Sequence, residues 1–95
     1  MDPRQVELRA LEAQQAGDFV GAIALWNELL KEYPNWELGY SHYSLADCYT
    51  RIGELDLAEE AYKKAMSLSP QDTLFSNALE SFVSARAAGY LHQAP

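Results

Sequence analysis

The chain has 95 residues, with 7 basic and 14 acidic side chains that give a formal net charge of −7. This length suits a single domain, and a hydrophobic content of 48% with one cysteine favours a globular core that has no internal disulfide. The negative charge would repel phosphate backbones, and no basic cluster offsets it, so we expect no binding to nucleic acid.

Apolar side chains at helical spacing predict an all-α chain of five helices, over about residues 3–16, 19–33, 36–51, 55–68 and 73–88. Asp2 is the expected cap of the first helix, and Pro3 occupies a first helical position, where proline is favoured. Asn35 and Asp72 are the expected caps of the third and fifth helices. Gly39, inside the expected third helix, should cost about 1 kcal/mol relative to alanine.

The fourth helix has acidic residues early and lysines late, an order that complements the helix dipole. Glu59 with Lys63, and Glu60 with Lys64, are expected to form pairs four residues apart. In the fifth helix the side chains expected to face inward are Phe75, Ala78, Leu79 and Phe82.

The first two pairs of helices have the same residues in register. Gly17 lies 36 residues before Gly53, and Pro34 lies 36 residues before Pro70. The same spacing relates Phe19 to Leu55, Ala22 to Ala58, Trp26 to Tyr62 and Leu29 to Ala65. So many matches predict an internal repeat.

The repeat divides the single domain, residues 1–95, into consecutive parts. These are repeat one at 3–36, repeat two at 37–72, a capping helix at 73–89 and a frayed tail at 90–95.

These residues resemble the tetratricopeptide repeat family, whose signature is Trp-x2-Leu-Gly-x2-Tyr, then Ala-x3-Phe, then Pro. The second repeat reads His42-x2-Leu45-Ala46-x2-Tyr49, then Ala58-x3-Tyr62, then Pro70. The first repeat keeps Gly17, Ala22-x3-Trp26 and Pro34, and its first helix is degenerate. The family period is 34 rather than 36, and the two extra residues fall near Trp36 to Leu38.

The resemblance implies a short α-solenoid of antiparallel hairpins whose first, third and fifth helices line a concave groove. In this family such a groove holds a peptide or a helix of a partner protein. The groove candidates are Arg4, Glu7, Trp36, Tyr40, Tyr43, Ser44, Asp47 and Arg51. Aromatic side chains with a polar tip suit peptide recognition, but a stripe at helical spacing is equally typical of packing against helix one or five.

The best-known groove of the family is a carboxylate clamp of Lys, Asn and Arg. Its positions read Glu7, Leu11 and Ser44 here, which would not hold a C-terminal carboxylate. We therefore predict an adaptor or scaffold module that binds another protein by a different chemistry. The alternative is a self-associating module, such as a homodimer, or a segment of a longer helical-repeat assembly, since two repeats are fewer than the usual three. Four apolar side chains are also expected to stay exposed: Leu8, Leu11, Val83 and Leu91.

No constellation of catalytic groups is visible, so we expect neither an enzyme nor a cofactor. Cys48 is expected to be an inert core thiol facing the fourth helix. His42 is expected to be a core histidine, and His92 lies too far along the chain to form a metal site with it. The chain has no apolar run of about 20 residues and begins without the blocks of a signal peptide, so we expect a cytoplasmic protein with no membrane contact.

Overall fold

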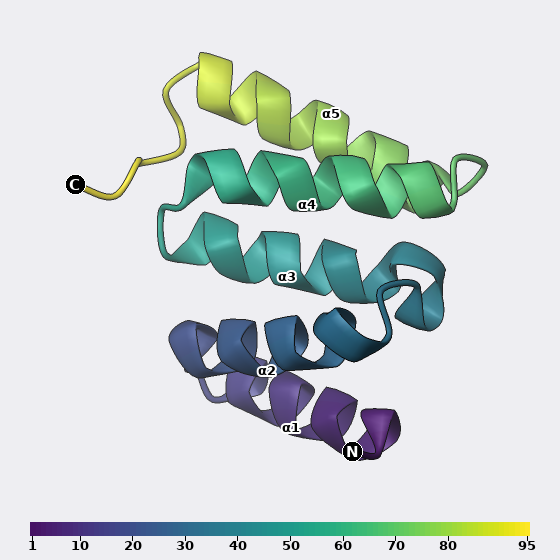
Figure 1. Cartoon of the computed structure of the whole chain (residues 1–95). Helices are drawn as coiled ribbons and strands as arrows, with labels where there is room; N and C mark the ends of the chain where they lie inside the picture. Colours follow the sequence, from purple (N-terminus) through teal and green to yellow (C-terminus); the bar gives the residue numbers. More distant parts are fainter.

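Five α-helices and one short 3-10 helix make up the chain in a computed structural model that describes all 95 residues. They are α1 (Pro3–Gln15), α2 (Phe19–Glu32), η1 (Trp36–Gly39), α3 (Tyr40–Arg51), α4 (Leu55–Leu68) and α5 (Thr73–Ala87). Each α-helix packs against the next one along the chain, and Figure 1 shows the five stacked in chain order with alternating directions. The predicted all-α stack of antiparallel helices is therefore confirmed.

Three helices begin directly after an aspartate whose side chain caps them. Asp2 Oδ1 accepts a hydrogen bond from the Arg4 N–H at 3.0 Å, and Asp72 Oδ1 accepts one from the Leu74 N–H at 2.9 Å, as the sequence predicts. Asp18, which was not predicted as a cap, serves α2 in the same way. These carboxylates satisfy N–H groups that have no partner inside a helix.

The first helix of each repeat and α5 end in the same kind of turn. Gly17, Gly53 and Gly89 are left-handed, with φ of 80°, 82° and 81°, a conformation in which a side chain is strained. After each glycine the next N–H reaches back at 2.9 Å, from Asp18 to Ala13 O, from Glu54 to Tyr49 O and from Tyr90 to Ala85 O. Helix α5 therefore ends as the first helix of each repeat ends.

Two apolar clusters share α3 and together form the core. The first contains Val6, Ala10, Ala22, Trp26, Leu29, Leu30, Leu45 and Cys48, and the second contains Ala46, Leu55, Ala58, Ala61, Tyr62 and Phe82. Ala22 and Ala58, which match in the repeat, both have no exposed surface. Small side chains at these positions let the helix backbones approach closely, and larger ones fill the space between them.

The predicted third helix is divided into two elements at Gly39. Glu37 and Leu38 have φ of 56° and 48°, and Gly39 has φ of 104°, so three consecutive residues are left-handed before α3 begins at Tyr40. Gly39 is buried because η1 packs on α4, and a Cβ there would lie 2.7 Å from the Ala65 carbonyl oxygen. The expected cap, Asn35, makes no side-chain hydrogen bond to the helix. Each left-handed non-glycine residue costs roughly 1–2 kcal/mol.

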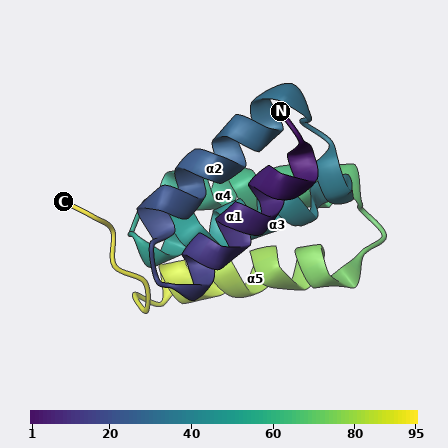
Figure 2. The same cartoon turned by 90° about the horizontal axis from the view of Figure 1, so that it is seen from below.

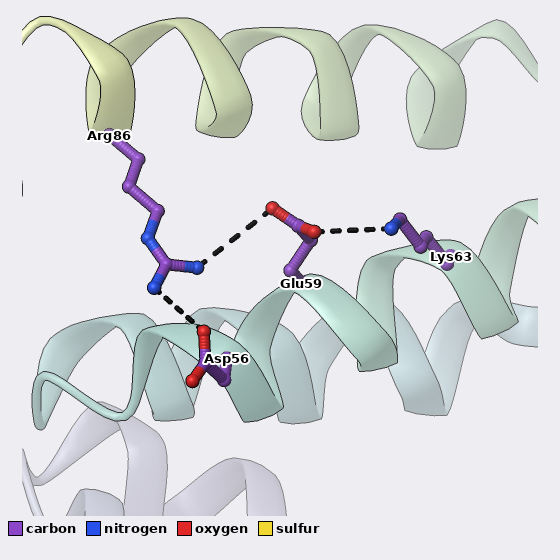
Figure 3. A network of polar contacts seen from close by, with 4 residues as sticks. All are labelled: Asp56, Glu59, Lys63 and Arg86. Carbon is purple, nitrogen blue, oxygen red and sulfur yellow. Dashed lines mark hydrogen bonds and ion pairs between the residues drawn. The ribbon is translucent and has the colours of Figure 1, made fainter.

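Arg86 of α5 is bound by two carboxylates of α4, as Figure 3 shows. Its guanidinium lies 2.7 Å from Asp56 Oδ1 and 3.9 Å from Glu59 Oε1, and Glu59 also pairs with Lys63 at 3.1 Å. The predicted Glu59–Lys63 pair is thus present, whereas Glu60 and Lys64 form no ion pair in the structure. Such exposed pairs contribute up to about 1 kcal/mol each, so they orient α5 rather than hold it.

Residues 90–95, predicted to fray, lie against the turn between α3 and α4. The Ala94 N–H donates to the Gly53 carbonyl at 2.9 Å, and Leu91 packs on the second cluster. A Cβ at residue 53 would lie 2.8 Å from the Ala94 nitrogen, so this contact depends on the glycine.

The end helix α5 has an apolar side and a polar side, as predicted. Phe75 and Phe82 are buried, and Ala78 and Leu79 are half-buried. The side chains that face away from the stack are exposed and polar: Asn77, Glu80, Ser81 and Ser84. Of the four apolar residues expected to stay exposed, Leu8 and Val83 are exposed, whereas Leu11 and Leu91 are half-buried.

Candidate functional site

Helix α3 occupies the middle of the stack, and α1, α3 and α5 all run in one direction (Figure 1). Seen from below in Figure 2, α2 and α5 lie at opposite sides of the view. The predicted groove residues come from α1, η1 and α3, and the surroundings of each side chain show whether it is free to bind a partner.

Tyr40 and Tyr43 form the aromatic part of the predicted site. Tyr40 stands at the start of α3 and is 47% exposed, and its ring centre lies 5.7 Å from that of Tyr43. Tyr43 is half-buried, with its ring 5.7 Å from Phe75 of α5 and 6.1 Å from Tyr62 of α4. The aromatic stripe therefore divides: Tyr43 packs against neighbouring helices, and Tyr40 rests on it with one side open to solvent.

Trp36 and Glu7 connect η1 to α1. The Trp36 Nε1–H donates to Glu7 Oε2 at 2.9 Å, and the indole packs on the first cluster and edge-to-face with Tyr33 at 6.0 Å. Both predicted groove residues are thus engaged within the chain. Their hydrogen bond fixes the orientation of the indole at one end of the stack.

The polar members of the predicted set are placed differently from one another. Asp47 Oδ1 lies 3.5 Å from Arg51 Nε, and the Arg51 guanidinium lies 5.4 Å from the centre of the Phe19 ring of α2. Ser44 is buried and so is unavailable to a ligand. Arg4 is exposed, and none of the ion pairs includes it. Asp47, with 41% of its side chain exposed, keeps acceptor capacity toward solvent.

Cys48 is part of the packing, whereas His42, which was expected to be a core histidine, is only half-buried and belongs to neither apolar cluster. Cys48 belongs to the cluster formed with α1 and α2, so the prediction that it faces the fourth helix is corrected; it lies one turn after Leu45 on the side toward the first hairpin. Burial raises the pKa of the Cys48 thiol to about 11, which keeps the thiol protonated and poorly nucleophilic near neutral pH. His42 Nε2 lies 2.9 Å from the Pro34 carbonyl oxygen, and burial lowers the pKa of this imidazole.

Ser41 was not singled out by the sequence, yet it is the one buried side chain with an unpaired polar atom. Its side chain is fully buried, and its Oγ has no hydrogen-bond partner. Serine in a helix often bonds to the carbonyl four residues earlier, but here that residue is Glu37, whose backbone is left-handed.

No group of three or more His, Cys, Asp or Glu side chains is placed to hold a metal ion. None of the helices combines the length and the apolar character that crossing a membrane would need.

Two hollows flank η1, on the side of the stack where the chain connects α2 to α3 and α4 to α5. One, of about 560 Å³, is lined by Glu37, Leu38, Tyr40, Ser69, Gln71, Asp72 and Phe75. The other, of about 500 Å³, is lined by Glu32, Tyr33, Pro34, Asn35, Trp36, Glu37 and Leu38. Except for Trp36 and Tyr40, none of these residues was a predicted site residue, and the only sequence signal for them is the longer repeat period.

The tetratricopeptide repeat family matches the chain twice, at residues 9–35 and 39–72. Together the two matches cover more than half of the chain. Residues 36–38, at the start of η1, and helix α5 lie outside both. Comparisons with curated proteins and with solved structures found no match.

Proposed function

Because this chain belongs to the tetratricopeptide repeat family, whose members are generally protein–protein interaction modules, we propose that it binds a peptide or a helix of a partner protein. The proposed site is the face of α3 that carries Tyr40 and Asp47, and we include Arg4 of α1, which is exposed. One observation carries this proposal: an aromatic ring that is 47% exposed in the middle of a stack of family repeats.

Tyr40 suits the role of an anchor because its support is already rigid. Its ring rests on Tyr43, which is held in turn by Phe75 and Tyr62. A partner that packs on Tyr40 would therefore order few additional side chains, and the entropic cost of binding would be small. The phenol oxygen also offers a hydrogen bond at the edge of the apolar contact.

Asp47 lies two helical turns beyond Tyr40 and would supply a negative charge to the same partner. With a net charge of −7 the protein attracts cationic segments and repels acidic ones. The three positions that would form a carboxylate clamp support the same choice. Glu7 is acidic and bonded to Trp36, Leu11 is apolar, and Ser44 is buried. The proposed partner segment is therefore neutral or basic, with an apolar side chain for Tyr40.

The test is affinity capture of partners on three forms of the protein: wild type, Tyr40→Ala and Tyr90→Ala. Tyr90 provides a matched control because it is a tyrosine that is 80% exposed and lies outside the proposed site. We expect a partner that wild type and Tyr90→Ala retain equally and that Tyr40→Ala loses by about tenfold or more, which corresponds to about 1.4 kcal/mol.

Equal retention of every partner by Tyr40→Ala and wild type would contradict the proposal, provided that circular dichroism shows the variant to be folded. Asp47→Asn gives a second reading, because it removes a charge without removing a side chain. Its loss of binding should diminish at high salt, where charges are screened.

A further inference from the structure

Residues 36–38, which lie between the two family matches, form a second surface together with their neighbours on α2 and before α5. We infer that this surface is a docking site for a basic segment of a partner protein that carries an apolar side chain next to Lys or Arg. We name it the η1 surface and define it by Glu32, Tyr33, Glu37, Leu38 and Asp72. Tyr40 of the α3 face also lines the first hollow beside η1, whereas Asp47 lines neither hollow, so Asp47 distinguishes the two sites.

The backbone of η1 is held on both sides of Leu38. The Leu38 carbonyl accepts a hydrogen bond from Ser69 Oγ at 2.5 Å, and Gly39 is buried on α4. On the other side, Trp36 is bonded to Glu7 of α1. These contacts impose the left-handed backbone at Glu37 and Leu38.

The strained backbone presents side chains that the fold itself does not use. Leu38 is 68% exposed and Glu37 is exposed, so neither residue gains burial in return for its conformation. Strain that is maintained without a packing benefit is typical of binding sites. An exposed leucine on a fixed backbone is also a preorganised apolar contact, because little freedom remains to be lost when a partner binds.

Leu38 lies between two hollows that can receive side chains. They measure about 560 Å³ and 500 Å³, and both are lined by Glu37 and Leu38. Tyr33, which is 37% exposed, lines the second hollow and Asp72 lines the first. A peptide that crosses Leu38 could therefore place one side chain in each hollow.

Charge determines which partner fits. The two hollows contain three carboxylates, Glu32, Glu37 and Asp72, and no Lys, Arg or His lines either one. A Lys or Arg side chain would lay its apolar stem on Leu38 or Tyr33 and bring its charge to these carboxylates. An acidic segment would be repelled, and so would a second copy of this chain, whose net charge is −7.

The test uses a displayed library of random peptides of about twelve residues, which reach roughly 40 Å when extended. Peptides enriched on the wild-type protein are synthesised with a fluorophore, and their Kd is measured by anisotropy. The variants are Leu38→Asn and Glu37→Gln, with Glu80→Gln on the outer side of α5 as the matched control. Asparagine tolerates the left-handed conformation, so Leu38→Asn removes the apolar side chain while keeping the backbone.

We expect enriched peptides in which Lys or Arg adjoins a large apolar residue. Leu38→Asn should raise their Kd about tenfold and Glu37→Gln about threefold, whereas Glu80→Gln should leave it unchanged. Higher salt should weaken binding to the wild type and have less effect on Glu37→Gln.

Three results would overturn the inference: no enrichment, enrichment of acidic or uncharged peptides, or basic peptides whose Kd is unaffected by Leu38→Asn. If their Kd is unaffected by Leu38→Asn and Glu37→Gln but rises in Asp47→Asn, the η1 surface is excluded while the proposed role of the α3 face is supported. The two proposals therefore fail separately.

Discussion

Replacement of Ala58 by glutamate is the perturbation that most severely tests the repeat register. Ala58 has no exposed surface and belongs to the cluster of Leu55, Tyr62 and Phe82. The introduced carboxyl would be buried among these apolar side chains. It could also not reach solvent without separating α4 from its neighbours.

The expected cost follows from two contributions. Overpacking of a filled core costs about 1–3 kcal/mol. A buried carboxyl without a partner has its pKa raised by up to about 3–5 units above 4.3, so it is protonated in the folded state at pH 7. The cost of keeping it protonated depends on the interval between 4.3 and 7, which at 1.36 kcal/mol per unit is about 3–4 kcal/mol. The sum of about 4–7 kcal/mol is comparable to the lower part of the range of unfolding free energies expected for a domain, about 5–15 kcal/mol.

The assay is urea unfolding followed by circular dichroism, with Ala24→Glu as the control at an exposed position of α2. The control should lose about 0.5 kcal/mol or less, because only helix propensity changes. Part of the cost of Ala58→Glu should disappear as the pH falls toward 4, where the carboxyl is protonated in both states. A loss below about 1 kcal/mol, or one equal to that of the control, would refute the register.

Three further stability predictions concern α3 and its entry. Leu38→Asn should raise the free energy of unfolding by about 0.5–1 kcal/mol, because asparagine is less strained at φ 48° and little burial is lost; chemical denaturation of both proteins checks this. A destabilised variant would show that the exposed leucine contributes more than the strain costs. Ser41→Ala should stabilise by about 1 kcal/mol in the same assay, because the unpaired Oγ is removed, and any loss would indicate that Ser41 Oγ has a partner. Burial raises the Cys48 pKa from 9.0 to about 11, so as the pH rises the thiol loses its proton in the unfolded state before it does so in the folded state. The free energy of unfolding should therefore fall between pH 9 and 11 by up to about 2–3 kcal/mol. Cys48→Ala should flatten this part of the stability–pH profile, and an identical profile would contradict a buried thiol.

Most of the fold could be predicted because its determinants are local or repeated. Asp2 and Asp72 cap helices by accepting from the N–H two residues ahead of them, and the glycines at 17 and 53 end helices through their own backbone. Ala22 and Ala58 occupy the same position in the two copies of the hairpin, and both are buried. Periodicity and spacing carry this kind of information.

The start of α3 could not be predicted because it depends on distant contacts. The left-handed residues before Tyr40 are held by Ser69, which lies 31 residues after Leu38, and by the packing of Gly39 on α4. Dependence on distant contacts also limited the prediction of the candidate site. Whether Tyr43 packs or binds was decided by Phe75 and Tyr62, two residues whose positions beside it are set by tertiary structure.

The central claim is that the face of α3 is the binding surface. The most direct measurement is amide hydrogen exchange of the protein alone and with a partner recovered in the capture experiment on wild type. The account predicts slower exchange in α3, over Tyr40–Arg51, and around Arg4 of α1, the other member of the proposed site. Slower exchange confined to α2 and α4, with α3 and α1 unchanged, would contradict it.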